Sequence, residues 1–150
     1  MQRRIVPHVV DGSRPLTTVA PETTVVEVAR RLRAHHVAAA LVVADERLLG
    51  IVTERDITYR VVAEGLDPAR VTVREIMTPN PVTAHPGMTA VEALELMRRG
   101  HFRHLPVVRD GQLFAMVSIR DLYEAVRSSL EEELQEAEHF IHGEAYGTGV

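Results

Sequence analysis

The sequence predicts a mixed α/β fold of the α+β type, with two β-α-β-β-α units packed sheet to sheet about a pseudo-two-fold axis. The chain repeats itself: residues 21–57 align with residues 86–122 without a gap, and 13 of the 37 positions are identical, against about two or three expected by chance. Helical periodicity alternates with short β-branched runs in each copy. A unit of about 60 residues is marginal alone, so two copies should share a core.

The first helix of each copy is predicted to begin at a threonine. Thr24 and Thr89 are each followed three residues later by a glutamate, Glu27 and Glu92. This spacing is typical of a capping box, in which two side chains satisfy free N–H groups at a helix start. Apolar residues then recur at helical spacing, so each helix should lay one apolar face on a core: Val25, Val28, Ala29 and Leu32 in the first copy, Ala90, Ala93, Leu94 and Met97 in the second.

A β-hairpin is predicted after each of these helices. Apolar runs at 41–43 and 48–52 flank a polar turn at 45–47, and runs at 106–108 and 113–117 flank a turn at 110–112. Short β-branched runs joined by an Asp- or Gly-containing turn favour a hairpin. A short leading strand is expected at 16–18 and at 82–84, and a second helix after Thr53 and after Ser118.

The chain is predicted to divide into a first repeat at 5–66, a second repeat at 67–127 and an extension at 128–150. Residues 63–79, with Gly65, Pro68 and Pro79, are expected to form a linker with a short helix. The last helix should run long and end near Gly143, with 144–150 frayed. Its apolar stripe needs a covering surface, either its own module or a dimer partner: Leu122, Val126, Leu130, Leu134 and Ala137.

The composition excludes several classes of function. The chain is 45% hydrophobic and 25% charged and has no cysteine, which excludes disulfides and cysteine nucleophiles and fits a reducing cytoplasm. No apolar run reaches the roughly 20 residues of a membrane span, and the N-terminus lacks the apolar segment of a secretory signal. A net charge of −4 argues against a nucleic-acid partner.

The sharpest local feature is a Thr/Ser-x-Arg-Asp element, which occurs once in each copy. It spans 53–56 in the first copy and 118–121 in the second, after a predicted strand and at the start of a predicted helix. A helix cap alone would explain each element. The alternative is a ligand site, because a helix N-terminus favours anions and an aspartate there can accept the hydroxyls of a ribose.

Three segments carry a resemblance to a known family: GIVTERD at 50–56, HFRHLPVV at 101–108 and IMTPNPVT at 76–83. With these segments, residues 5–130 resemble the cystathionine-β-synthase (CBS) domain family, and the pair resembles a Bateman module. The resemblance implies two clefts between the repeats for an adenosyl ligand such as AMP, ADP, ATP, NAD or S-adenosylmethionine.

The resemblance also implies roles for particular residues. Thr53, Asp56, Ser118 and Asp121 would bind ribose. Thr17, Thr18, Thr83 and Ala84 would frame the base through backbone contacts. Arg55, Arg120, His101, Arg103 and His104 would take the phosphates.

The two copies differ at positions expected to face the ligand. The second copy has Arg-His-Leu-Pro at 103–106 where the first has Ala-Ala-Ala-Leu at 38–41. Alanine offers no charge or donor to a phosphate, so the second copy should contribute the better phosphate site. Ala115 replaces Gly50, which would either narrow a cleft or improve packing.

These features predict a regulatory module rather than an enzyme, with no resident cofactor or metal. The sequence has no phosphate-cradling Gly-x-x-x-x-Gly-Lys and no Gly-x-Ser-x-Gly. His139 and His142 would share a helix face beside Glu138, but two or three ligands without a fixed fourth are a weak zinc signature. A homodimer and a downstream protein partner are expected. The alternative function is a structural, protein-interaction or dimerisation module with degenerate clefts.

Overall fold

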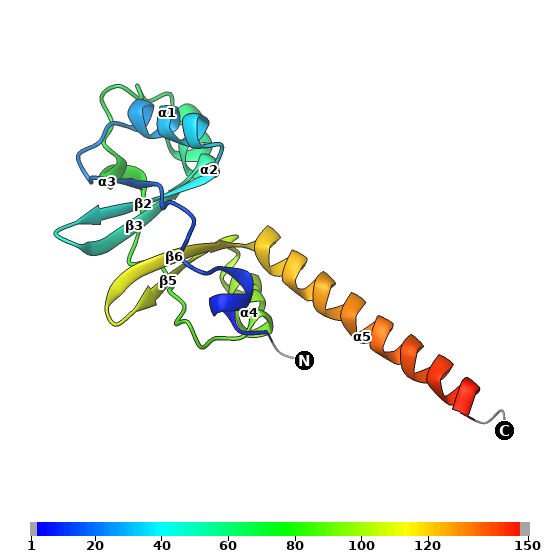
Figure 1. The fold of residues 1–150 in the computed structure, drawn as a ribbon. Coiled ribbons are helices and arrows are strands. Elements are labelled where there is room, and N and C mark those ends of the chain that lie inside the picture. The colour runs from blue at the N-terminus through cyan, green and yellow to red at the C-terminus, as the bar shows by residue number, and fades with distance from the viewer. Residues whose placement is uncertain (1–2, 148–150) are drawn as a thin grey trace.

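The computed structural model describes residues 3–147 of the chain, and two α/β halves face each other through their sheets (Figure 1). A π-helical turn, η1 (Ile5–Val9), precedes both halves. The first half contains β1 (Thr18–Val19), α1 (Val25–His35), β2 (Ala39–Ala44), β3 (Arg47–Thr53), α2 (Glu54–Ile57) and η2 (Thr58–Val62). The rest of the chain contains α3 (Val73–Ile76) and β4 (Thr78–Pro79), which joins the sheet of the first half, and then the second half with α4 (Ala90–Gly100), β5 (His104–Arg109), β6 (Gln112–Ser118) and α5 (Ile119–Gly147).

The predicted helix starts are confirmed, but only one of the two predicted capping boxes forms. At α4, Glu92 Oε2 accepts the Thr89 N–H at 3.0 Å and Thr89 Oγ1 accepts the Glu92 N–H at 3.2 Å. Thr24 is the N-cap of α1, yet its side chain makes no capping bond, so the prediction of a box with Glu27 is wrong. The Val25 N–H instead donates to the Val71 carbonyl at 2.9 Å, and the linker thereby supplies the cap from outside the helix.

Both predicted hairpins are present. β2 pairs antiparallel with β3, and β5 with β6. The turns place Asp45, Glu46, Asp110 and Gly111 at positive φ, as the turns that match the twist of a hairpin require. The leading strands are shorter than predicted: β1 pairs in parallel with β2, whereas Ala84 makes a single bridge to Val107.

The alternation of side chains along the strands builds a layered core. Ala40 and Val42 of β2 point to the cluster beneath α1, while Ala39 and Leu41 point to the opposite face. On that face the first sheet packs against Leu113 and Met116 of the second half. Because successive strand residues point to opposite faces, one hairpin serves both its own helices and the other sheet. The predicted sheet-to-sheet arrangement is therefore confirmed.

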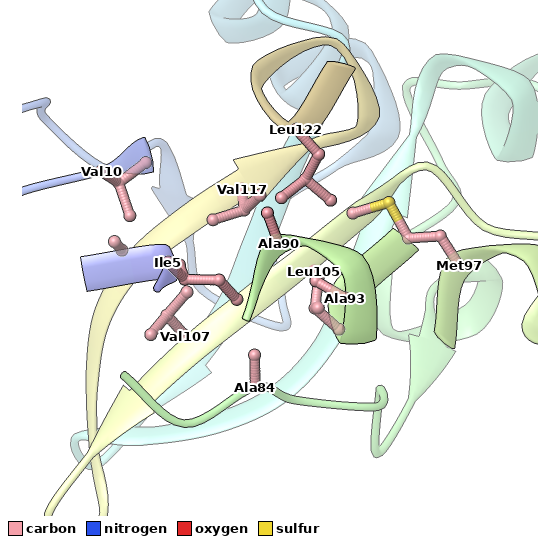
Figure 2. Close-up of a cluster of buried hydrophobic side chains, with 11 residues drawn as sticks. Ile5, Val10, Ala84, Ala90, Ala93, Met97, Leu105, Val107, Val117 and Leu122 are labelled. Atoms are coloured by element: carbon pink, nitrogen blue, oxygen red, sulfur yellow. The ribbon is translucent and has the colours of Figure 1, made fainter. Parts of the chain in front are cut away.

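The leading segment of each half packs on the other half. Ile5 of η1 is fully buried in the core of the second half, among side chains of α4, β5 and β6 (Figure 2). Its N–H donates to the Met88 carbonyl at 2.8 Å. In the same way Val73 of α3 is fully buried in the core of the first half, and its N–H donates to the Thr23 carbonyl at 2.8 Å. The two halves thus exchange segments that precede their own sequence repeats.

The last helix, α5, is longer than predicted and leaves the body of the molecule (Figure 1). It passes through Gly143 and continues to Gly147, so the predicted stop at Gly143 is wrong. The fraying of the tail stays a prediction, and residues 148–150 lie outside the described residues. Leu122 is fully buried, but Leu130 and Leu134 are 55% and 64% exposed. Of the two covering surfaces considered for the stripe, the module itself therefore covers only the proximal part.

Candidate functional site

A cavity of about 1140 Å³ lies between the two halves. One wall comes from residues 7–17, which include the end of η1 and the segment between η1 and β1, and another from residues 36–39 at the start of β2. The remaining wall belongs to the second half and includes Arg103, His104 and residues 118–121. Residues from both halves therefore meet at one site, so a ligand here would contact both.

The Ser118–Asp121 element lies on the wall of this cavity and caps α5. Asp121 Oδ2 accepts the Ser118 N–H at 2.9 Å, and Ser118 Oγ accepts the Asp121 N–H at 3.2 Å. The matching element in the first half has the same geometry, with 2.9 Å from the Thr53 N–H to Asp56 Oδ2 and 3.2 Å from the Asp56 N–H to Thr53 Oγ1. The helix-cap interpretation is thus correct for both elements, and the cap uses only one oxygen of each carboxylate as an acceptor.

The structure brings only some of the predicted site residues together. Six of them line the cavity: Thr17, Arg103, His104, Ser118, Arg120 and Asp121. The other seven do not: Thr18, Thr53, Arg55, Asp56, Thr83, Ala84 and His101. His101 is the left-handed C-cap of α4, at φ 55°, and Ala84 is buried beneath β5. The roles of all thirteen in ligand binding remain predictions.

Thr17 is buried and already has a hydrogen-bonding partner. Its Oγ1 lies 2.8 Å from His35 Nδ1, and its carbonyl accepts the Leu41 N–H at 2.9 Å. The position fits a structural role at the back of the cavity, where backbone groups rather than the hydroxyl would face a base.

Sequence reasoning missed most of the wall that residues 7–16 form, together with His36, Val37 and Glu54. Arg14 is the clearest omission, because its Nη2 lies 3.2 Å from Asp121 Oδ1 and its Nη1 lies 3.4 Å from Asp121 Oδ2. The two residues are 107 positions apart. No local pattern marks such a pair. Pro15 matches Pro81 of the second copy only after a one-residue shift of the alignment, and this match is the one sign in the sequence that the segment belongs to the repeat.

The charges in the cavity are balanced. Its lining contains three arginines, Arg14, Arg103 and Arg120, and three acids, Asp11, Glu54 and Asp121. His8, His36 and His104 add titratable groups. Burial lowers the pKa of His104, an effect opposed by the nearby Asp121 and Glu54 carboxylates and reinforced by Arg103. His104 therefore favours its neutral form more than a free histidine does.

Gly50 has a packing role, and this role explains why the first copy has a glycine at the position where the second copy has Ala115. A Cβ at Gly50 would lie 2.5 Å from Met77 Sδ and 2.9 Å from the Thr78 carbonyl oxygen. The missing side chain lets β4 pair with β3, where Gly50 lies opposite Pro79. Ala115 instead lines the cavity. At Gly50 the first sheet thus has a fourth strand beside it, whereas the equivalent residue of the second sheet, Ala115, faces the cavity.

Two kinds of feature are absent from the described part of the chain. No helix there is long and apolar enough to cross a membrane. Within residues 3–147 no three His, Cys, Asp or Glu side chains are placed to hold a metal ion together. A zinc site at His139 and His142 is therefore not proposed.

The fold and the cavity define a tandem α/β module with a ligand-sized cleft between its halves. The chain belongs to the CBS domain family: the family model for the CBS domain matches twice, at residues 4–63 and 73–128. The predicted boundary between 66 and 67 falls between the two matches.

Curated relatives include the CBS domain-containing protein CBSCBSPB2 of Arabidopsis thaliana, 44% identical over 111 residues. That alignment covers 73% of this chain but only 21% of the plant protein. The chain therefore spans about a fifth of the length of the plant relatives it matches.

Solved structures share the fold over most of both chains. A CBS-domain containing protein from Agrobacterium tumefaciens matches with a TM-score of 0.75 and 36% identity, covering 80% of this chain and 97% of that one. A CBS domain protein from Pyrobaculum aerophilum, complexed with AMP, matches with a TM-score of 0.67 and 34% identity, covering 73% of this chain and 84% of that one.

Proposed function

We propose that this chain is a regulatory module that binds an adenosyl ligand in the cavity between its halves and transmits occupancy to a partner. The observation that carries the proposal is the meeting of Ser118, Asp121 and the basic residues Arg103 and Arg120 around one cavity. A carboxylate at a helix start can accept ribose hydroxyls, while arginines recognise phosphate. The AMP complex of the Pyrobaculum aerophilum relative supports the same class of ligand.

The transmission of ligand occupancy to a partner is supported by the residues that line the cavity, which come from both halves. Because both halves contribute, a ligand that contacts both favours one relative placement of the halves over others. The long helix α5 starts at the cavity, where Ile119 and Asp121 line it, and leaves the body at its other end. A change at the cavity would therefore reach a helix that is exposed to partners. We place the module in the class of sensors and not of enzymes, and we expect it to form a homodimer.

Titration calorimetry against AMP, ADP, ATP, NAD and S-adenosylmethionine tests the proposal. Asp121→Ala should weaken binding by about 10- to 100-fold, because hydrogen bonds to a charged group contribute roughly 1.5–3 kcal/mol each. Glu92→Ala is a matched control, since Glu92 makes the same kind of cap at the start of α4, outside the cavity and apart from the residues expected to bind ligand. Both variants should lose about 1 kcal/mol of unfolding free energy, as helix caps do, yet only Asp121→Ala should lose ligand.

The alternative is a structural dimerisation module with a degenerate cleft. Its supporting observation is the exposed stripe on α5, where Leu134 and Ile141 are 64% and 63% exposed. Failure of every compound in the panel to bind the wild-type chain would exclude the sensor and leave this alternative. Equal loss of binding in Glu92→Ala and Asp121→Ala would show that the loss follows from the missing helix cap and not from a contact between Asp121 and the ligand.

A further inference from the structure

Residues 10–17, here called the strap, cross the cavity between two fixed ends. Val10 is buried in the core of the second half, and Thr17 is buried at the edge of the first. Leu16 packs against the cluster between the sheets. Figure 1 shows this dark-blue segment passing between the halves. Because both ends are anchored, the middle of the strap has a defined path along the cavity.

A tight turn sets the position of Arg14 within the strap. Gly12 has φ +79°, and a Cβ there would lie 2.6 Å from the Phe114 ring, so the position requires glycine for both its backbone angle and its space. The Asp11 carboxylate accepts the Ser13 N–H at 2.9 Å and closes the turn. Arg14 follows directly and is directed across the cavity to the second half.

The Arg14 guanidinium occupies the oxygens that a ribose would need. Its two contacts with Asp121, at 3.2 and 3.4 Å, use both carboxylate oxygens, and Oδ2 also accepts the Ser118 N–H. These contacts are longer than the 2.7–2.9 Å typical of strong charged hydrogen bonds. The Arg14 side chain is also 67% exposed. A long, exposed ion pair of this kind is weak and readily exchanged.

The corresponding position in the other half carries no such group. Pro15 matches Pro81, so Asn80 stands where Arg14 stands. Asn80 follows β4, and its N–H donates to the Leu49 carbonyl at 3.0 Å. The segment before the second repeat that corresponds to the strap is therefore bonded to β3. The second repeat has no counterpart of the ion pair between Arg14 and Asp121 at this position.

We infer that Arg14 makes the cavity select ligands that carry a phosphate; this inference rests on the proposed function. A ribose that bonds to Asp121 displaces the guanidinium, which then needs another anion. A phosphate on the same ligand supplies one, and its geometry suits two parallel bonds from arginine. A nucleoside without phosphate breaks the ion pair and offers no replacement, so it binds more weakly.

Calorimetric titration of wild type, Arg14→Ala and Arg14→Lys with AMP and with adenosine tests the inference. In Arg14→Ala we expect AMP to bind about tenfold more weakly and adenosine to bind equally or a few-fold more tightly. Arg14→Lys should fall between, because lysine keeps the charge but not the two parallel bonds. Arg70→Ala is the control: it removes an equal charge from an 88% exposed side chain outside the cavity and should change neither affinity.

The outcomes separate the inference from the function on which it rests. A wild-type chain that binds both compounds, with Arg14→Ala unchanged or weakened equally for both, overturns the inference and leaves the proposed function standing. A wild-type chain that binds neither compound overturns the inference, and failure across the full ligand panel overturns the proposed function too. A fall in AMP affinity alone, with Arg70→Ala unaffected, supports the role of Arg14.

Discussion

His104 begins β5 on the cavity wall, half-buried and close to charges of both signs. Burial is the largest influence and lowers its pKa, whereas Asp121 and Glu54 act in the opposite direction. When the protein unfolds, the imidazole returns to an ordinary pKa of about 6.5. Below that value the unfolded chain binds a proton that the folded chain lacks, so acid favours unfolding at this residue.

Replacement of His104 by glutamine should therefore reduce the acid sensitivity of the fold. As pH falls from about 8 to about 5.5, through the ordinary histidine pKa, wild type should lose more unfolding free energy than His104→Gln. Urea denaturation at both pH values measures the difference, and the other histidines, present in both proteins, cancel. An equal loss in the two proteins would show that His104 titrates normally.

Asp56 and Asp121 show how far the sequence alone specifies a residue. Their local patterns are equivalent, and their capping bonds agree in length. Their other partners differ, because Asp56 is 3.9 Å from Arg60 on the next turn while Asp121 meets Arg14 from a distant segment. Local spacing predicted the caps, but only the packing of the strap placed one aspartate on the cavity.

At the scale of elements, Gly50 decides how many strands the first sheet has. The β3–β4 pairing brings the Thr78 carbonyl to within 2.9 Å of where a Cβ would lie. The sequence showed that Gly50 is replaced by Ala115 in the second copy, but it did not show the structural reason. That reason is the approach of β4, which is not part of the β2–β3 hairpin, to Gly50. A two-residue strand such as β4 leaves too little periodicity to predict.

Gly50→Ala should destabilise the fold by about 1–3 kcal/mol, since a methyl group there would push both the Met77 side chain and the Thr78 backbone away from β3. Gly87→Ala is a matched control, because its nearest neighbours are side-chain atoms of Arg4 and His85 at 3.3 Å or more. That control should stay within about 0.5 kcal/mol of wild type. Chemical denaturation measures both, and similar losses would mean that β4 does not approach β3 this closely.

At the scale of the whole molecule, the exchanged leading segments join the two halves. Ile5 completes the core of the second half and Val73 that of the first. Each half therefore depends on the segment that leads into the other repeat. The boundary between residues 66 and 67 divides the repeats in the sequence. The two buried cores do not follow this boundary, because Ile5 lies in the core of the second half and Val73 in the core of the first.

The distal part of α5 carries an apolar stripe, defined as Leu130, Leu134, Ala137 and Ile141, that no part of the described chain covers. These residues recur at spacings of four, three and four, which is typical of a helix-pairing seam. Glu131 and Glu138 flank it. Like charges along a shared seam repel, so pairing of two copies should strengthen as salt screens the glutamates.

Leu134→Asp should abolish self-association without unfolding the monomer, because the side chain is 64% exposed. His139→Asp places an acidic side chain at an exposed position on the opposite face of the helix from the stripe, and should leave association intact. Sedimentation at low and high salt measures the oligomeric state of all three proteins. A wild-type monomer at both salt concentrations, or a Leu134→Asp dimer, would rule out the stripe as the dimer contact.

The sequence by itself determined the hairpins and the helix starts, since each depends on residues only a few positions apart. It also determined the repeat and the family, since both follow from comparing residue order without any knowledge of contacts. It also identified six of the residues that line the cavity. Tertiary structure alone decided the exchange of leading segments, the fourth strand allowed by Gly50 and the pairing of Arg14 with Asp121 across 107 positions. Local periodicity reports which face of an element is buried; it carries no information on which distant segment buries it.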